Sequence, residues 1–300
     1  MSFLTKPYYR TRVLIKLCYY DSLSDEEFLK KVFPKYMGYP LDLENPKTFS
    51  EKLQWLKVNY REPIQTVMVD KHEAKHFIAQ RVGDQYIIPT LAIWDSVEDI
   101  DFDALPNQFV LKCTHDSGGI VICKDKSSLD RETAKAKLSA SLQRDYSRIA
   151  REWPYKDVPR RIIAEEYLSE LGNNEILDYK MYCFHGEPKI TVVCSDRFSK
   201  TGTRMNFYDI NWKPMGIHFG HYPPLSTEFP RPETYDEMLR LAMELSKDCP
   251  FLRVDFYEIK GRLYIGELTF FPGAGLEQFR PITKDYELGE WLHLETVHRG

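Results

Sequence analysis

Alternating apolar and polar positions predict a β-hairpin in the last part of the chain. Over residues 251–259, apolar side chains alternate with Arg253 and Asp255, so these two polar residues share one face of a strand. A second strand-like run covers residues 263–270, after a short polar turn at 260–262. This hairpin is the centre of the interpretation, because it sets acidic residues into otherwise apolar strands.

The length of the turn decides whether two acids of this hairpin meet. A two-residue turn leaves Asp255 and Glu267 on opposite faces. A three-residue turn, residues 260–262, pairs Ile259 with Leu263 and places Asp255 directly across from Glu267, with about 5 Å between the Cβ atoms. We predict the three-residue turn, because each acid is costly to bury without a cation or hydrogen-bond donors.

Two opposed carboxylates repel each other unless a divalent cation lies between them. Mg²⁺ takes oxygen ligands and often links carboxylates to phosphates, so Asp255 and Glu267 are the candidate magnesium ligands. Thr269 lies on the same predicted face and adds a hydroxyl oxygen. The alternative is an ordinary hairpin whose acids pair with Arg253 or with a lysine.

Helical periodicity predicts the remaining large elements. Residues 1–60 are predicted to be helical but carry no evident chemistry; within them, two pairs have capping-box spacing, Ser24 with Glu27 and Thr48 with Glu51. Three later helices are predicted: one that opens at Asp70-Lys71 and ends before Gly83, one over 131–150, and one capped at Thr234, with Glu237 at its third position, that runs to about Lys247.

A Gly-rich segment joins two further predicted strands. The strand 109–112 ends in Lys112, and the strand 120–122 follows a loop that contains Gly118 and Gly119. Paired glycines let backbone N–H groups approach a phosphate, and Lys112 adds a point charge. The sequence contains neither a Walker loop nor G-x-G-x-x-G, and a simple turn is the alternative.

Charged residues at three other places suggest an anionic or nucleotide ligand. Lys71 lies in the first turn of its helix, where the helix dipole disfavours a cation unless an anion is near. The strand 161–168 ends with Glu165 and Glu166, and the inward-facing one is placed to accept from the amine of adenine. Strands over 181–184 and 189–194 precede a loop-rich stretch with three cations: Arg197, Lys200 and Arg204. In each case the alternative is a solvated surface position.

Composition narrows the class of protein. The chain has 300 residues and a net charge of −4, which argues against nucleic-acid binding. Its six cysteines are scattered and form no C-x-x-C, so we expect reduced, buried thiols and a cytoplasmic location. Neither a signal peptide nor a transmembrane segment is visible, because the N-terminal apolar residues are interrupted by Arg10, Arg12 and Lys16. Residues 8–20 have instead the pattern of a basic amphipathic surface helix.

The motifs, taken in order, resemble the TupA-like branch of the ATP-grasp superfamily over residues 46–280: TFSEKLQWLK, DK, IIPTL, FVLKCTHDSGG, EEYL, DYKMYCFHG and RVDFY…LYIGELTFFPGAG. The resemblance implies an α+β ATP-grasp fold, with a helical N-terminal extension and a nucleotide held between two α+β subdomains. The implied segments are a helical segment (1–60), a pre-ATP-grasp segment (61–105), a lid subdomain (106–168) and a C-terminal subdomain with the metal site (169–300).

The resemblance also implies residue roles. Lys71 and Lys112 resemble the lysines that hold the ATP phosphates, and three residues resemble the loop that covers them: Ser117, Gly118 and Gly119. Three residues resemble the family's adenine hinge: Glu165, Glu166 and Leu168. Asp178 and Lys180 resemble polar contacts on the nucleotide side. Asp255 and Glu267 resemble the Mg²⁺ ligands, Arg253 the arginine that steadies an acyl phosphate, and Thr269 replaces the usual asparagine ligand. We further hypothesise that Arg197 and Arg204 hold the acceptor carboxylate, or its acyl phosphate, beside Arg253.

The activity that the resemblance implies is an ATP- and Mg²⁺-dependent ligation of a carboxylate to an amine through an acyl phosphate. TupA-like proteins are associated with surface polymers that contain uronic acids, so a sugar-acid carboxylate and an amino acid or other amine are the expected substrates, in capsular or other polysaccharide synthesis. Peripheral contact with a membrane-associated assembly machinery is compatible with this role. The alternatives are an ATP-dependent phosphotransferase on a glycan, or a glycosyltransferase or non-catalytic nucleotide-binding partner, although no convincing D-x-D is found.

Overall fold

Two antiparallel sheets form the frame of the protein. The computed structural model describes residues 22–168, 176–195, 203–220 and 228–297. The four-stranded sheet has the order β1 (Thr90–Trp94), β4 (Ile162–Glu166), β2 (Phe109–Cys113), β3 (Ile120–Cys123). The five-stranded sheet has the order β10 (Arg262–Thr269), β9 (Phe251–Ile259), β5 (Asp178–Phe184), β6 (Glu187–Ser195), β7 (Arg204–Asp209), and a two-stranded pair joins β8 (His218–Phe219) to β11 (Phe279–Arg280). The predicted α+β class is confirmed.

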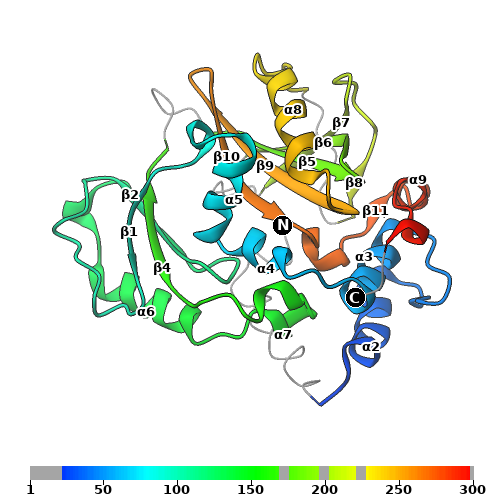
Figure 1. Cartoon of the computed structure of the whole chain (residues 1–300), viewed down its shortest axis with the longest axis horizontal. Helices are drawn as coiled ribbons and strands as arrows, with labels where there is room; N and C mark the ends of the chain where they lie inside the picture. Colours follow the sequence, from blue (N-terminus) through cyan, green and yellow to red (C-terminus); the bar gives the residue numbers. More distant parts are fainter. Residues whose placement is uncertain (1–21, 169–175, 196–202, 221–227, 298–300) are drawn as a thin grey trace.

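Helices cover and connect these sheets. They are α2 (Asp25–Met37), α3 (Phe49–Asn59), α4 (Ile64–Val69), α5 (Glu73–Val82), α6 (Arg131–Leu142), α7 (Ser147–Ala150), α8 (Tyr235–Ser246) and α9 (Thr283–Trp291). Figure 1 shows α4 and α5 in the middle of the molecule, with β1, β2 and β4 on one side and the longer sheet on the other. The two capping boxes predicted for α2 and α3 are both formed.

Two helix predictions need correction. The helix predicted over 131–150 is two helices, α6 and α7, because its apolar residues pack in different places: Leu138 in the core beside β2 and Ile149 against the α2 cluster. Thr234 precedes α8 but does not cap it, since its hydroxyl donates to Glu258 Oε2 at 2.6 Å.

Each sheet has its own hydrophobic core. The four-stranded sheet packs against α6 through a group that includes Phe109, Leu111, Leu138 and Ile162, all fully buried. The larger core joins the five-stranded sheet to α3, α4, α5, α8 and α9. β1 completes the first sheet, although its residues fall in the segment 61–105 that the sequence set apart from the lid subdomain. The nucleotide-binding residues predicted from the sequence therefore lie on two separately packed sheets.

Helix α3 uses its polar side chains to hold a loop near the C-terminus. Gln54 Nε2 donates to the carbonyl oxygens of Ala274 (3.1 Å) and Gly275 (2.8 Å). The fully buried Lys57 donates from Nζ to the carbonyls of Ala274 and Ala150, both at 2.8 Å. This loop follows β10 directly, so the N-terminal helical region helps to fix the end of the candidate metal hairpin.

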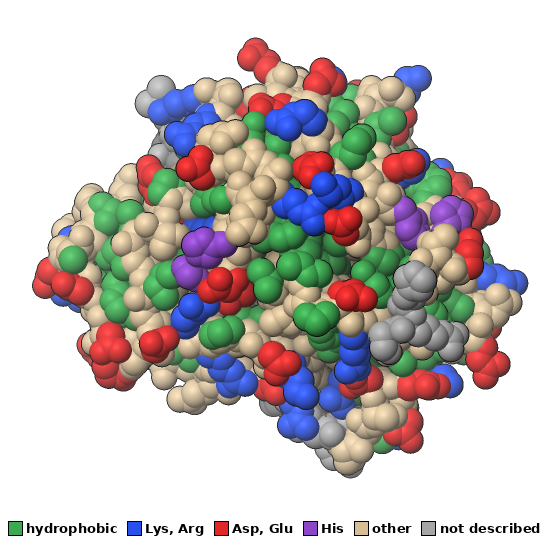
Figure 2. Space-filling view, in the orientation of Figure 1, with side chains coloured by type: hydrophobic (Ala, Val, Ile, Leu, Met, Phe, Trp, Pro, Cys, Tyr) green, Lys and Arg blue, Asp and Glu red, His purple; other side chains and the backbone are tan. Residues whose placement is uncertain are grey.

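The structure also describes thiols, a charged surface and helix lengths. The five cysteines that the structure describes are buried free thiols. On the face shown in Figure 2, acidic and basic side chains are interspersed and hydrophobic side chains gather between them near the middle. Within the described ranges, no helix combines the length and apolar character that crossing a bilayer requires.

Candidate functional site

Asp255 and Glu267 face each other across the hairpin, but not for the reason that the sequence suggested. Ile259 pairs with Arg262, so Lys260 and Gly261 form a two-residue turn with φ values of 53° and 73°. Positive φ at both positions is typical of the tight hairpin turns that match strand twist. The predicted three-residue turn is therefore wrong.

A β-bulge restores the register. The pairing shifts between Ile265 and Glu267, where Gly266 is one extra residue in β10, and Glu267 then pairs with Asp255. The predicted opposition of the two acids is confirmed. A Cβ on residue 266 would lie 2.6 Å from the ring of Tyr257. Any residue larger than glycine at the bulge would therefore require the ring to move.

Asp255 is held by two cations. Arg253 donates from Nε to Asp255 Oδ1 at 2.6 Å and from Nη2 to Asp255 Oδ2 at 2.8 Å, and its Nη2 lies 3.1 Å from Thr269 Oγ1. Lys180 donates to Asp255 Oδ2 and lies 2.7 Å from Asp178 Oδ2. For Asp255 the structure thus shows the alternative, in which an acid of the hairpin pairs with Arg253 and with a lysine.

The charges in this cluster offset the cost of burial. Burial alone would raise the pKa of Asp255, but the charges of Arg253 and Lys180 outweigh it and hold the pKa below its usual value. Burial would likewise lower the pKa of Lys180, yet Asp178 and Asp255 raise it. Asp255, Arg253 and Lys180 are therefore ionised at neutral pH, and the cluster presents a fixed array of charge.

A second charged cluster lies on the four-stranded sheet. Glu165 is buried on β4, with Oε2 2.5 Å from Lys112 Nζ of β2 and Oε1 2.7 Å from Lys75 Nζ of α5. Burial would raise the pKa of Glu165, but the charges of Lys112 and Lys75 lower it. The predicted inward-facing acid of this strand is thus Glu165, and its partners are lysines.

The two clusters lie within electrostatic range of each other. Burial alone would lower the pKa of Lys112, but its electrostatic interactions, first with Glu165 and then with Tyr257 and Glu267, raise it. Tyr257 and Glu267 belong to the hairpin of the other sheet. Lys75 and Lys112 therefore lie on one side of the region between the two sheets, and Asp255 and Glu267 lie on the other. This arrangement suits an anionic ligand that is bound together with a metal cation.

The Gly-rich loop is tied to its surroundings. Lys71 Nζ donates to the backbone oxygen of Asp116, and Ser141 Oγ of α6 donates to the Asp116 carboxylate. Gly119 is buried, and a Cβ there would lie 2.1 Å from Ser141 Oγ. Glycine is therefore needed at 119 for packing against α6, a reason that the sequence argument about phosphate access did not include.

The remaining predicted nucleotide residues lie around this loop and at the end of β4. Ser117 is exposed and Gly118 has a φ of 108°. Glu166 is exposed, and its backbone N–H already donates to Pro89 O at 3.0 Å. Leu168 follows β4 and is half-buried.

Of the two arginines predicted to bind the acceptor, the structure describes only Arg204, and it does not lie beside Arg253. Arg197 lies outside the described residues. Arg204 begins β7 and is exposed, although the sequence suggested a loop there. Strand pairing aligns Arg253 with Asp209 of β7, three strands away, or about 14 Å. Arg204 lies five residues farther along that strand, so the structure does not bring it together with Arg253.

Sequence reasoning missed Lys75, which forms the lysine pair with Lys112 where Lys71 was expected. The predicted position of Lys71 in the first turn is wrong, because α5 begins at Glu73 with His72 as its N-cap and Lys71 lies before that cap. Lys75 lies in the helix itself and reaches Glu165 of β4, whereas Lys71 donates to the backbone oxygen of Asp116.

Two buried acids near the hairpin were also missed. Burial raises the pKa of Glu152 to about 7; Lys57 opposes this and Glu267 adds to it. Burial raises the pKa of Glu277 to about 7, against the charges of Arg253 and Lys180. Neither acid lies in a strand, so no alternating pattern marks it in the sequence.

Comparison with known proteins supplies one family match. The sequence model of the family described as TupA-like ATPgrasp matches residues 51–293. No curated protein has a significant match to this sequence.

Several solved structures are similar in fold. They include a D-alanine–D-alanine ligase from Bacillus anthracis complexed with ATP, with a TM-score of 0.40, 16% identity, and coverage of 68% of this chain and 55% of that one. The ATP-grasp ligase PsnB, complexed with a variant precursor, Mg and ADP, has a TM-score of 0.44 and 12% identity, with coverage of 81% and 65%. A D-alanine–D-alanine ligase from Helicobacter pylori has a TM-score of 0.42 and 13% identity, with coverage of 81% and 69%. This chain thus spans little more than half the length of the first of these proteins.

Proposed function

This chain belongs to the TupA-like ATP-grasp family, and from that premise we propose that it is an ATP-dependent ligase that joins a carboxylate to an amine. The observation that carries the proposal is the opposition of Asp255 and Glu267, within electrostatic range of the half-buried Lys112 on the other sheet. Two acids for a metal and two lysines for phosphates are the parts that phosphoryl transfer from ATP requires.

The residues of the hairpin fit a magnesium ion. Asp255, Glu267 and Thr269 offer only oxygen atoms, which is the donor set that Mg²⁺ prefers. Asp255 and Thr269 already share contacts with Arg253, so a bound ion would take over part of their interactions. Bound with ATP, Mg²⁺ supplies the positive charge that neutralises the polyphosphate during transfer.

The protein's own residues hold and orient the reactants. Glu165 keeps the ammonium groups of Lys75 and Lys112 at one place, where they match a phosphate. Asp255 and Thr269 fix the plane of the Arg253 guanidinium, which suits a carboxylate or an acyl phosphate. Burial of this cluster excludes water, which protects an acyl phosphate from hydrolysis.

For the substrates we propose a sugar-acid carboxylate and an amino acid or other amine, in the synthesis of capsular or related surface polysaccharide. The support is the resemblance of the chain to TupA-like proteins, together with the basic side chains near the hairpin that match a carboxylate. The buried thiols favour a cytoplasmic location, where ATP is available. Peripheral contact with a polysaccharide assembly machinery at the membrane belongs to the same proposal.

A screen of ADP formation tests the proposal. The purified protein is incubated with ATP, Mg²⁺ and a matrix of sugar acids crossed with amines, and Glu267→Gln serves as the matched control for contaminating ATPases. ADP that appears only when a carboxylate and an amine are both present, with an amide product by mass spectrometry, supports the ligase.

Three other results would replace the ligase with an alternative. A phosphorylated product formed without an amine would identify a phosphotransferase. Release of a nucleoside diphosphate from a nucleotide-sugar, without ATP, would identify a glycosyltransferase. Nucleotide binding without turnover over the whole matrix would favour a non-catalytic partner.

A further inference from the structure

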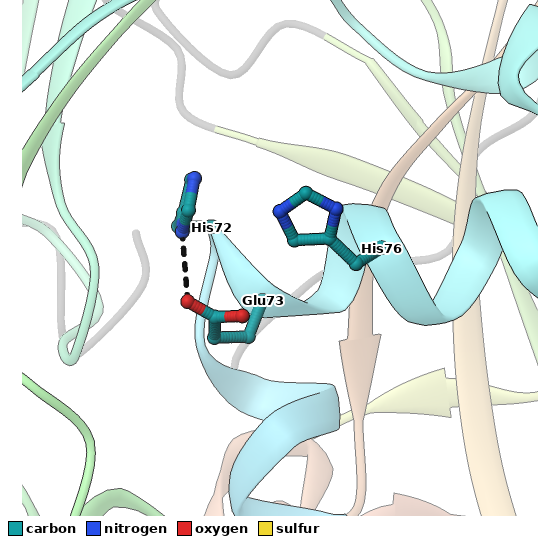
Figure 3. A group of neighbouring side chains, drawn as sticks. All are labelled: His72, Glu73 and His76. Atoms are coloured by element: carbon teal, nitrogen blue, oxygen red, sulfur yellow. Dashed lines mark hydrogen bonds and ion pairs between the residues drawn. The ribbon is translucent and has the colours of Figure 1, made fainter.

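The start of α5 brings two imidazoles and a carboxylate together. The sequence His72-Glu73-Ala74-Lys75-His76 places two histidines four residues apart, on one face of the helix. Figure 3 shows His76 directed to the side of the helix where His72 and Glu73 are hydrogen-bonded. We propose that His72, Glu73 and His76 form a binding site for a transition-metal ion of the Zn²⁺ class, separate from the Asp255–Glu267 hairpin.

The distances suit one small ion. His72 Nδ1 and Glu73 Oε1 are 2.9 Å apart, the two imidazole centroids are 5.2 Å apart, and one ligand atom from each residue lies within 4.8 Å of the others. Zinc binds histidine nitrogen and carboxylate oxygen at about 2.0–2.2 Å, so ligand atoms on opposite sides of an ion lie roughly 4 Å apart. Small side-chain rotations therefore close the site.

The donor set selects the class of metal. Two imidazoles with one carboxylate favour zinc, nickel, copper or cobalt, whereas Mg²⁺ prefers oxygen ligands alone. His72 and Glu73 are half-buried and His76 is exposed, so an ion remains accessible to water as a further ligand. The chemistry thus separates this site from the acids proposed to hold magnesium.

Neighbouring groups position the ligands. Asp70 Oδ1 accepts from the backbone N–H groups of His72 (2.8 Å) and Glu73 (3.4 Å), which fixes the first turn of the helix. Arg161 Nη2 donates to Asp70 Oδ2 and to Glu73 Oε1, both at 3.0 Å. Arg161 therefore competes with a metal for the Glu73 carboxylate while it keeps Asp70 in place.

The same spacing occurs in zinc peptidases, where the glutamate acts as a general base. Here the Glu73 carboxylate contacts the His72 ring, so it is placed as a ligand. Within the described part of the chain, no other His, Cys, Asp or Glu joins the group. The arrangement therefore supports metal binding and gives no support to hydrolysis.

Zinc titration of the metal-free full chain, without nucleotide, tests the site. Isothermal titration calorimetry on the wild type is expected to show one Zn²⁺ per chain, and Asp255→Asn is expected to bind it equally well. Loss of a residue that only hydrogen-bonds to a metal ligand weakens metal binding roughly 10- to 100-fold. Loss of a ligand itself, in His76→Gln, should therefore weaken zinc binding at least about 100-fold. His293→Gln, which changes another exposed histidine, is the matched control and should bind as the wild type does.

Arg161→Gln sharpens the test, because it frees Glu73 and should therefore tighten zinc binding. Thermal unfolding without metal confirms that each variant is folded. Unchanged zinc affinity in His76→Gln would overturn the proposal, as would loss of zinc binding in Asp255→Asn at a temperature where thermal unfolding shows that this variant is folded. Neither result depends on ATP turnover, so failure of this site is distinguishable from failure of the ligase.

Discussion

Asp255 of β9 and Glu267 of β10 are paired only because Gly266 is an extra residue between them and the turn. The two-residue turn at Lys260-Gly261 by itself would send the two acids to opposite faces of the hairpin. The bulge thus creates the pair of carboxylates on which the proposed metal site depends.

Glu267→Gln is expected to abolish ligase activity without loss of stability. No ion pair of Glu267 is seen among the described residues, and its side chain is half-buried, so the amide replaces the acid at little structural cost. ADP formation should fall at least about 100-fold, as for loss of a metal ligand. Urea unfolding without ligands should give the wild-type midpoint, and a normal rate of ADP formation would exclude Glu267 from the metal site.

Asp255→Asn is expected to lose both activity and stability. The asparagine leaves Arg253 with no carboxylate partner that the structure shows, and Lys180 with Asp178 alone. Removing one partner of a buried ion pair lowers the free energy of unfolding by about 3–5 kcal/mol. The free energy of unfolding from urea titration should fall by about this amount, and an unchanged value would show that the Arg253 contact is not formed in solution.

Gly266→Ala is expected to destabilise the hairpin through Tyr257. The new Cβ would lie 2.6 Å from the tyrosine ring, and overpacking of this kind costs roughly 1–3 kcal/mol. A double-mutant cycle measures the coupling: the cost of Gly266→Ala should shrink in a Tyr257→Ala background. Equal costs in both backgrounds would argue against the close approach of the ring.

Lys75→Met is expected to weaken ATP binding more than Lys71→Met. Lys75 points at Glu165 beside Lys112, whereas the Lys71 ammonium donates to the Asp116 backbone oxygen. A hydrogen bond from a charged group contributes about 1.5–3 kcal/mol, so the Lys75 variant should bind ATP roughly 10- to 100-fold more weakly. Equilibrium binding of ATP measures both variants, and a larger effect at Lys71 would restore the assignment made from the sequence.

Stability should depend on pH through Glu277. Burial raises the pKa of this acid from 4.5 to about 7, so the folded state binds more protons than the unfolded state between these values. Its contribution to stability is present below pH 4.5 and is lost as the pH rises to about 7. The free energy of unfolding of Glu277→Gln should therefore fall less over this range than that of the wild type, whereas the exposed Glu290→Gln should follow the wild type. Parallel curves for Glu277→Gln and the wild type would contradict the shift.

Alternation and capping predicted the elements well because both are local. The strands around Lys112, Glu165 and Asp255 and the capping boxes of α2 and α3 follow from residues close in sequence. The bulge at Gly266 was not predictable in this way, since counting back from the turn assumes a regular ladder and the reason for the extra residue is the ring of Tyr257.

The candidate site was predicted less completely, since its contacts join distant segments. The sequence identified Glu165 and Lys112 but not Lys75, and it did not predict that both lysines meet Glu165. It placed Arg204 near Arg253 because the two segments follow each other, whereas the order of strands in the sheet separates them. Buried acids such as Glu277 have no local signature, because their environment is made entirely by other parts of the chain.

The hydrogen bond from Lys57 to Ala274 joins residues 217 positions apart, which sets the order of events during synthesis. Until the chain beyond Ala274 has left the ribosome, Lys57 and Gln54 lack the carbonyl groups that they hold in the finished protein. With the Ala150 carbonyl as its only acceptor of the two that it has in the folded structure, the Lys57 ammonium is poorly satisfied in an apolar core, so α3 does not reach its final packing until the segment around Ala274 has been made. Completion of this part of the proposed site therefore waits for the segment around Ala274, although α3, one of its supports, is made much earlier.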